Sequence, residues 1–246
     1  MINTYVSLDL ETTGLNPKQD KVIEIGAVKV VNGEIVDTYT TLVKPGRKLD
    51  DVVIQLTGID DSMLKGELVK EPNVAIPELL DFLGDHILLG HSILFDFSFV
   101  KRYAVNQRMT YEAEAIDTLK IARKYLQELP SRSLSALCEY YHITQNAHRA
   151  LEDAVATSHL YQRLLGDFYM TEQQTDSGEK TFAPQKLVYQ VKRESPITKS
   201  QREYLERLLL YHKIEPDFEI DCLTRNEASR KTDHIILQYG KMPKTE

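Results

Sequence analysis

The chain has 246 residues, of which 42% are hydrophobic and 27% are charged, and its net charge is −7. That composition is typical of a globular protein with a buried core, and it contains no apolar run of roughly 18 residues that could span a membrane. Its acidity argues against coating long nucleic acid by counterion release, and its start lacks a basic leader before an apolar stretch, so we expect a cytoplasmic protein without a membrane partner.

The first 43 residues are predicted to form three strands. Residues 4–11 alternate between apolar side chains and polar or acidic ones, which is the period of a strand. Residues 22–31 are rich in Val and Ile and predict a second strand. Asn32-Gly33 is a two-residue hairpin signal that leads into a third strand over 34–43. We expect an antiparallel meander at the start of a sheet.

Helices and strands alternate through the middle of the chain. Apolar residues spaced by about 3.6 positions predict helices, and short apolar runs predict buried strands. The predicted helices lie near residues 72–83, 95–103, 119–126, 134–141 and 151–165, and the predicted strands lie over 86–90 and 115–117. We therefore expect an α/β fold, a mixed sheet flanked by helices.

The character of the sequence changes in the last third. Residues 171–181 are polar, without periodicity, and predict a linker. Thr198 and Thr224 each stand three residues before a Gln or Glu, the spacing of a capping box that opens a helix, and Gly240 is a helix stop. The predicted units are a larger domain over 1–168, a linker over 169–196 and a small helical hairpin module over 197–246. Whether the module binds a partner or only stabilises the protein stays open.

Asp9 and Glu11 lie two residues apart on the first predicted strand, so both side chains point to the same face. Two neighbouring carboxylates repel each other unless a cation joins them. The alternative, a solvated strand edge, would be the better explanation for an isolated pair of this kind.

The acidic pair belongs to the first of three motifs that occur in order along the chain. The motifs are Asp9-Leu-Glu-Thr-Thr-Gly14 with Ile23-Glu-Ile-Gly-Ala27, then Leu88-Leu-Gly-His-Ser-Ile-Leu-Phe-Asp96, then His148-Arg-Ala-Leu-Glu-Asp153. In this order they resemble the motifs of the DEDD superfamily of 3′-to-5′ exonucleases, in particular the proofreading subunit of bacterial DNA polymerase III. The spacing of His148 and Asp153 resembles the histidine branch. The resemblance covers residues 1–168 and implies a ribonuclease H-like fold.

Helical geometry constrains the last motif. Positions 148 and 153 are five apart, or about 140° around an ideal helix, so both cannot face one point from the same helix. We expect His148 on a loop and the helix to begin near Ala150.

The resemblance implies a two-metal-ion mechanism. Two divalent ions, Mg²⁺ or Mn²⁺, prefer carboxylate oxygens and can activate water and stabilise a leaving oxygen. Asp9 would bridge the ions, Glu11 and Asp153 would hold the ion that carries the water, and Asp96 would hold the other. His148 would accept the proton of the water, since imidazole exchanges protons near neutral pH.

The resemblance also implies a set of substrate contacts. The expected substrate-binding residues are Thr12, Thr13, Gly14, Leu15, Thr57, His91 and Phe95. Gly14 would allow close backbone approach, whereas core packing explains Leu15 and Phe95 nearly as well. Ser92 stands where the family commonly has Asn, and Thr57 where proofreading subunits often carry His.

The expected function is metal-dependent 3′-to-5′ hydrolysis of DNA from single-stranded or frayed ends, releasing nucleoside 5′-monophosphates in proofreading or repair. An exoribonuclease acting on RNA ends or short oligonucleotides is the alternative, because the same five residues would serve it. An inactive binding protein with the nuclease fold is a third reading. If the protein proofreads, a separate DNA polymerase must be its partner.

Overall fold

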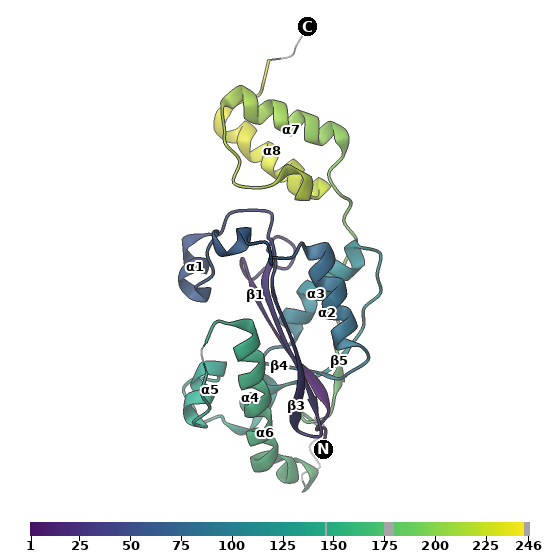
Figure 1. Cartoon of the computed structure of the whole chain (residues 1–246), viewed down its shortest axis with the longest axis vertical. Helices are drawn as coiled ribbons and strands as arrows, with labels where there is room; N and C mark the ends of the chain where they lie inside the picture. Colours follow the sequence, from purple (N-terminus) through teal and green to yellow (C-terminus); the bar gives the residue numbers. More distant parts are fainter. Residues whose placement is uncertain (146, 175–179, 244–246) are drawn as a thin grey trace.

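The computed structural model describes residues 1–145, 147–174 and 180–243. One six-stranded sheet, in the order β3-β2-β1-β4-β5-β6, forms the centre of the molecule, and a separate pair of helices stands at the end opposite the N-terminus (Figure 1). The strands are β1 Tyr5–Thr12, β2 Val22–Val31, β3 Glu34–Leu42, β4 Leu88–Gly90, β5 Glu114–Asp117 and β6 Gln185–Lys186. Strands β1 to β3 form the expected antiparallel meander, β4 and β5 run parallel to β1, and β6 runs antiparallel to β5.

The turn between β2 and β3 confirms the predicted hairpin. Asn32 has φ of 54° and Gly33 has φ of 86°, so both turn residues adopt the left-handed conformation that a two-residue primed turn requires.

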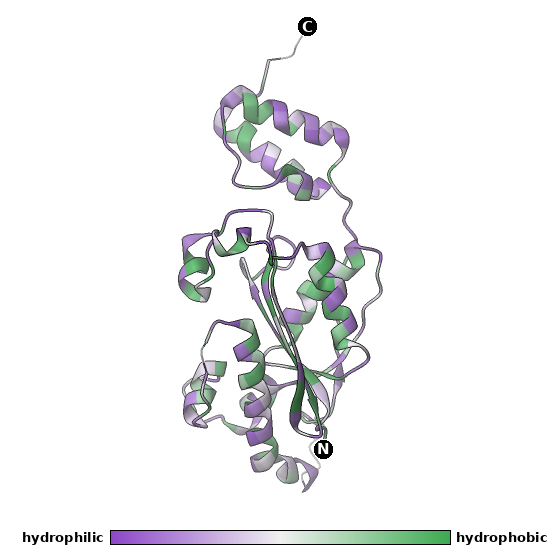
Figure 2. Cartoon of the chain, in the orientation of Figure 1, coloured by the Kyte–Doolittle hydropathy of each residue, from purple (hydrophilic) through white to green (hydrophobic). Residues whose placement is uncertain are grey.

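Helices cover both faces of the sheet. The helices are α1 Asp51–Thr57, α2 Pro72–Leu83, α3 Leu94–Asn106, α4 Thr118–Tyr125, α5 Leu134–Tyr140, α6 Ala150–Gln174, α7 Lys199–His212 and α8 Arg225–Tyr239, with short 3₁₀ helices η1 Met63–Lys65 and η2 Ile220–Cys222. Val6, Leu8 and Leu10 of β1 pack with α2 and α3, whereas Tyr5 of the same strand packs with α4, α5 and α6. The alternation of β1 therefore divides the core into two layers, and Figure 2 shows the central strands to be largely hydrophobic. Within the described residues no helix is both long and apolar enough to span a membrane.

Between β3 and α2, two short elements were not predicted from the sequence. α1 has seven residues, of which only Thr57 is buried, and η1 is a single turn whose one buried residue is Leu64. Elements this short carry no apolar periodicity, so the pattern gave no signal for them.

The segment expected to be a linker differs from the prediction. α6 continues to Gln174 instead of ending near 165, and β6 adds a strand to the sheet. Phe182 and Leu187 are buried in the core, and the buried carboxylate of Glu172 accepts hydrogen bonds from the backbone and hydroxyl of Thr181. A polar stretch held by one buried acid leaves no periodic trace in the sequence. Residues 175–179 of the predicted linker lie outside the described residues, and the division at 168 and 197 stays a prediction.

The tail module has the two predicted capping boxes, at Thr198 and Thr224, but it is not a hairpin. Backbone hydrogen bonds from Ile197 to Leu223 and from Arg225 to Ser195 join the starts of α7 and α8. His212 hydrogen-bonds the carbonyl of Gly240 and so joins their ends. Because their starts lie together and their ends lie together, the two helices run parallel. The connection between them is long enough to return from the end of α7 to its start. It also contributes three apolar residues to the core of the module: Ile214, Phe218 and Ile220.

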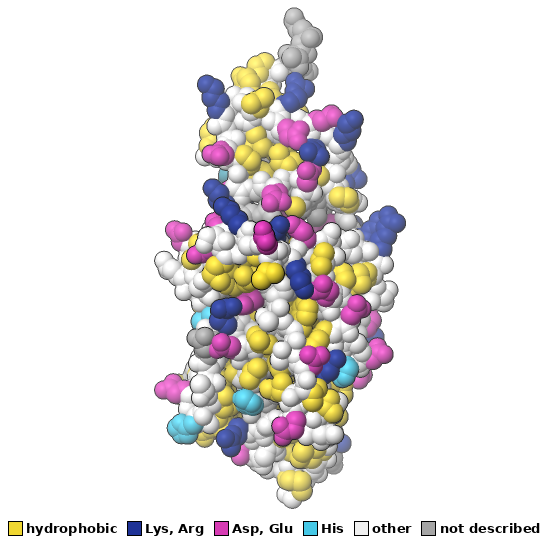
Figure 3. Space-filling model, in the orientation of Figure 1, with side chains coloured by type: hydrophobic (Ala, Val, Ile, Leu, Met, Phe, Trp, Pro, Cys, Tyr) yellow, Lys and Arg dark blue, Asp and Glu magenta, His cyan; other side chains and the backbone are white. Residues whose placement is uncertain are grey.

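The module rests on the part of the protein that contains the sheet, through polar contacts. The Lys48 amide donates to the backbone carbonyl of Asp217 at 2.9 Å, and the Glu219 amide donates to the backbone carbonyl of Gly46 at 2.8 Å. Lys21 pairs with Glu227 at 2.9 Å. Basic and acidic side chains are interspersed over the module on the face drawn in Figure 3, so this face has no large patch of one sign.

Candidate active site

β1 presents Asp9 and Glu11 on the face that α6 covers. In the register of the sheet Asp9 lies opposite Gly26 of β2, and Glu11 lies opposite Glu24. A Cβ atom on Gly26 would come within 2.1 Å of the Ala150 backbone. Only glycine at this position allows α6 to start so close to the strands, and this close approach brings the last motif to the acidic pair.

Asp96 reaches the site from the first turn of α3. β4 pairs with β1 only at Val6 and Ser7, so the later part of β1 has no strand neighbour on that side. The free backbone amide of Leu10 donates instead to the Asp96 carboxylate, at 3.0 Å. Asp96 is only 4% exposed, and this hydrogen bond fixes the buried carboxylate beside β1.

The turn before α3 contains Ser92, which stands where the family resemblance leads us to expect Asn. Ser92 has φ of 74°, in the left-handed region that Asn adopts more readily than Ser. Its amide donates to Asp117 at 2.9 Å, which holds the turn in place.

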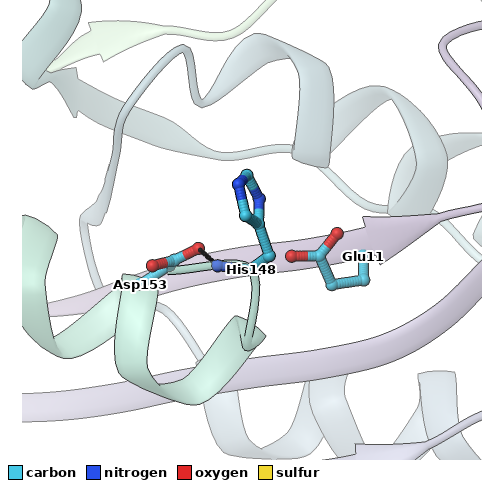
Figure 4. Close-up of side chains that lie close together, drawn as sticks. All are labelled: Glu11, His148 and Asp153. Atoms are coloured by element: carbon cyan, nitrogen blue, oxygen red, sulfur yellow. Dashed lines mark hydrogen bonds between the residues drawn. The ribbon is translucent and has the colours of Figure 1, made fainter. Parts of the chain in front are cut away.

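His148 and Asp153 occupy the predicted positions relative to α6. The helix begins at Ala150, and His148 precedes it with φ of 67°. The His148 amide donates to one oxygen of Asp153 at 3.0 Å, as drawn in Figure 4. The Gln145 side-chain amide donates to the other oxygen at 2.6 Å. Gln145 was missed by the sequence reasoning, since a lone Gln in a loop belongs to no motif.

Glu11, His148 and Asp153 form a compact group from two distant parts of the chain. Each offers one ligand atom, and the three atoms lie within 4.8 Å of one another. Figure 4 shows the imidazole standing between the two carboxylates. Glu11 comes from β1, Asp153 from the first turn of α6 and His148 from the loop before that helix.

The electrostatics of the site favour a bound cation. Burial, and then the charges of Asp96, Asp153 and Glu11, hold the pKa of Asp9 well above its usual range. Burial and the neighbouring Asp153 and Glu24 raise the pKa of Glu11 to about 7. Burial also raises the pKa of Asp96, although the Leu10 amide opposes the shift. Carboxylates that repel one another in this way suit hard divalent ions, which relieve the repulsion.

The predicted substrate loop after β1 is built around Asp20. Its carboxylate accepts from the Asn16 amide and the Thr13 hydroxyl, and Thr12 donates to the carbonyl of Gly14 at 2.7 Å. A Cβ on Gly14 would lie 2.5 Å from the Asp20 carboxylate, so packing inside the loop already requires this glycine. Leu15 is 84% exposed, which does not fit the core packing considered as its alternative.

The other three predicted contacts have partners inside the protein. The buried hydroxyl of Thr57 donates to Val53 and accepts from the Ile59 amide. Both ring nitrogens of His91 are hydrogen-bonded, one with the Thr118 hydroxyl and one with the Arg132 carbonyl, each at 2.9 Å. The partly buried ring of Phe95 packs 5.0 Å from Phe99. Their assignment as substrate contacts stays a prediction.

Comparison with known families identifies this arrangement. A family model described as Exonuclease (RNase_T) matches residues 6–161. The chain belongs to this exonuclease family. The matched region contains strands β1 to β5, apart from the first residue of β1, and leaves out β6. It includes all four acidic residues and His148.

The curated relatives of this chain are named as bacterial DNA polymerase III proteins. The DNA polymerase III subunit epsilon of Aquifex aeolicus is 35% identical over 168 residues, which are 68% of this chain and 82% of the relative. The PolC-type DNA polymerase III of Caldanaerobacter subterraneus is 39% identical over 65% of this chain but only 11% of its own length. The PolC-type relative of Halalkalibacterium halodurans is 36% identical over 96% of this chain and 17% of its own length. The chain thus spans about a tenth of the length of the first PolC-type relatives that it matches.

Solved structures share the fold of the exonuclease. Exonuclease X in complex with 5′ overhanging duplex DNA has a TM-score of 0.51 and 24% identity, and the match covers 72% of this chain and 94% of that one. The zinc-bound E. coli ExoI–ssDNA complex has a TM-score of 0.61 and 17% identity, over 69% of this chain and 42% of that one. These matches confirm the predicted ribonuclease H-like sheet flanked by helices.

Proposed function

We propose that the exonuclease removes nucleotides one at a time from the 3′ end of DNA, at single-stranded or frayed ends, and releases nucleoside 5′-monophosphates. The observation that carries the proposal is that Asp9, Glu11, Asp96 and Asp153, from three separate elements, gather around the end of β1 next to His148. Four carboxylates gathered in this way are costly for a metal-free protein and are the expected ligands of a two-metal site.

Asp9, Glu11, Asp96 and Asp153 would hold two divalent ions, Mg²⁺ or Mn²⁺. The ions, when bound, supply an activated water and stabilise the departing oxygen of the phosphodiester. The carboxylates themselves position this chemistry, since Asp96 is fixed by the Leu10 amide and Asp153 by Gln145 and the His148 amide.

His148 would accept the proton of the attacking water. Its side chain is exposed on a loop, and a ring nitrogen lies within 4.8 Å of carboxylate oxygens of Glu11 and Asp153. The His148 amide is tied to Asp153, so the loop that carries the base is anchored to a proposed metal ligand. The imidazole can therefore face the reacting water while its backbone stays fixed.

DNA is the favoured substrate because the relatives are named as DNA polymerase III proteins and the structural neighbours were solved with DNA. The subunit epsilon of A. aeolicus matches most of its length, so we propose that this chain also works beside a separate DNA polymerase. The same acidic site would serve RNA, which makes substrate choice a necessary part of the test.

The test is digestion of 5′-labelled oligonucleotides with Mg²⁺ or Mn²⁺. Single-stranded DNA, duplex DNA with a 3′ mismatch and RNA of the same sequence are compared, with EDTA as the metal-free arm. We expect a ladder that shortens by single nucleotides, release of 5′-monophosphates and no reaction in EDTA. Faster loss of RNA would overturn the DNA assignment. Equal activity of the wild type and the Asp9→Ala variant would overturn the proposed site.

A further inference from the structure

A fifth carboxylate lies beside the acidic cluster and is not among the proposed metal ligands. Glu24 of β2 stands directly opposite Glu11 of β1 in the register, and it is only 2% exposed. Like charges directly opposite each other on paired strands destabilise a sheet. A buried acid in this position therefore needs a compensating partner.

Glu24 is held by the residues that follow His148. Its carboxylate accepts hydrogen bonds from Nη2 of Arg149 at 2.8 Å and from Nε of the same side chain at 3.1 Å. Its second oxygen accepts the backbone amide of Ala150 at 3.0 Å. One carboxylate thus pairs with a guanidinium in a fork and also caps the first amide of α6, two favourable interactions for a negative charge at a helix start.

We propose that Glu24 is a positioning residue for the reaction, an inference that rests on the nuclease function proposed above. With Arg149 it fastens the loop of His148 and the first turn of α6 to β2, and so holds the base and Asp153 beside Glu11.

The geometry leaves little room for another arrangement. Arg149 lies between His148 and Ala150, and its carbonyl accepts the amide of Asp153 at 2.9 Å. A shift of Arg149 would therefore move both catalytic side chains. The close backbone contact over Gly26 resists sliding of α6 toward the strand. Movement away from the strand is opposed by the hydrogen bonds that Arg149 and the Ala150 amide donate to Glu24.

Glu172 provides a matched control far from the site. It is also 2% exposed, pairs with Lys124 at 3.1 Å and accepts backbone amides of Thr181 and Phe182. A Glu→Gln change there removes the same kind of buried, paired carboxylate without touching the loop of His148. An ion pair with a merely structural role would behave alike at both positions.

The experiment compares the full-length variants Glu24→Gln, Arg149→Met, the double variant and Glu172→Gln. We expect Glu24→Gln to lower kcat on single-stranded DNA by about 10–100-fold at saturating Mn²⁺, the usual cost of losing a residue that orients a ligand, with KM unchanged. Glu172→Gln should keep the wild-type kcat. The double variant should be more active than Arg149→Met alone, because Arg149→Met leaves a buried charge unpaired.

Trypsin reports on the loop without relying on activity. Cleavage after Arg149 requires the segment around the Ala150 amide to open, and that amide is the one that Glu24 accepts. We expect Glu24→Gln to be cut there faster than the wild type and Glu172→Gln, as read by mass spectrometry of the fragments.

Equal kcat in Glu24→Gln and Glu172→Gln, or an unchanged cleavage rate after Arg149, would overturn the positioning role. If the wild type degrades no nucleic acid, the proposed nuclease function fails. Cleavage after Arg149 still decides whether Glu24 anchors the loop.

Discussion

Replacing Glu11 with Gln should stabilise the metal-free protein at alkaline pH. Burial, Asp153 and Glu24 raise the pKa of Glu11 from 4.5 to about 7. The folded protein therefore holds a proton that the unfolded chain has released, and stability falls as the pH rises from about 4.5 to about 7. The pKa difference of about 2.5, at about 1.4 kcal/mol for each unit of pKa, amounts to about 3 to 3.5 kcal/mol. Gln resembles the protonated acid, so Glu11→Gln removes this penalty.

The assay is urea unfolding in EDTA, followed by far-ultraviolet circular dichroism because the chain has no Trp. We expect Glu11→Gln to raise the free energy of unfolding by up to about 3 kcal/mol at pH 8 and to change it little near pH 4.5. A variant that is less stable than the wild type at pH 8, or a difference that does not depend on pH, would refute the reasoning.

Glu172 supplies a control of opposite sign. Burial alone acts to raise its pKa, but hydrogen bonds from Thr181, Phe182 and Lys124 outweigh it and lower the pKa to about 2. The stability from Glu172 is thus present above its ordinary pKa and is lost as the pH falls toward 2. Glu172→Gln should therefore destabilise the protein at pH 8, where Glu11→Gln stabilises it.

Three further predictions follow from the site and the module. Mg²⁺ or Mn²⁺ should raise the Tm more at pH 8 than at pH 6, because protons compete with the cation below the raised pKa of Glu11, about 7. Thermal scans with and without EDTA test this prediction, and equal rises in Tm at both pH values would contradict it. His148→Ala should lower kcat by about 10²–10⁴-fold yet keep the metal-induced rise in Tm, and loss of that rise would make His148 a ligand rather than the base. Thr224→Ala should reduce the free energy of unfolding by about 1 kcal/mol, because the Thr224 hydroxyl caps the Glu227 amide. Thr232→Ala, in the interior of the same helix, should not have this effect. Equal losses of stability in urea titrations of the two variants would exclude capping as the cause.

Much of the fold was predictable because its signals are local. The strand over 4–11, the turn at Asn32 and the helix start at Ala150 each depend on side-chain period or backbone preference within a few residues. The same is true of the capping boxes at Thr198 and Thr224. Local chemistry of this kind is visible in a single sequence.

The features that escaped prediction depend on partners far along the chain. Glu24 and Arg149 lie in two of the motifs, but they are 125 positions apart, and nothing in either motif indicates that the two side chains pair. The parallel course of α7 and α8 is set by hydrogen bonds between their ends, which apolar spacing does not reveal. Gln145 acts through one carboxylate eight residues away, inside a loop that has no pattern.

β6 determines where the chain can be shortened. It pairs with the outer edge of β5 at Glu114 and Ala115, and the preceding Phe182 fills the core beneath. A chain truncated at residue 168, the end of the first domain predicted from the sequence, would expose the backbone groups of β5 and the hydrophobic residues that Phe182 covers. Exposed strand edges of this kind recruit other chains. A minimal soluble nuclease should therefore extend at least through Leu187, and shorter fragments should aggregate even though they contain every proposed catalytic residue.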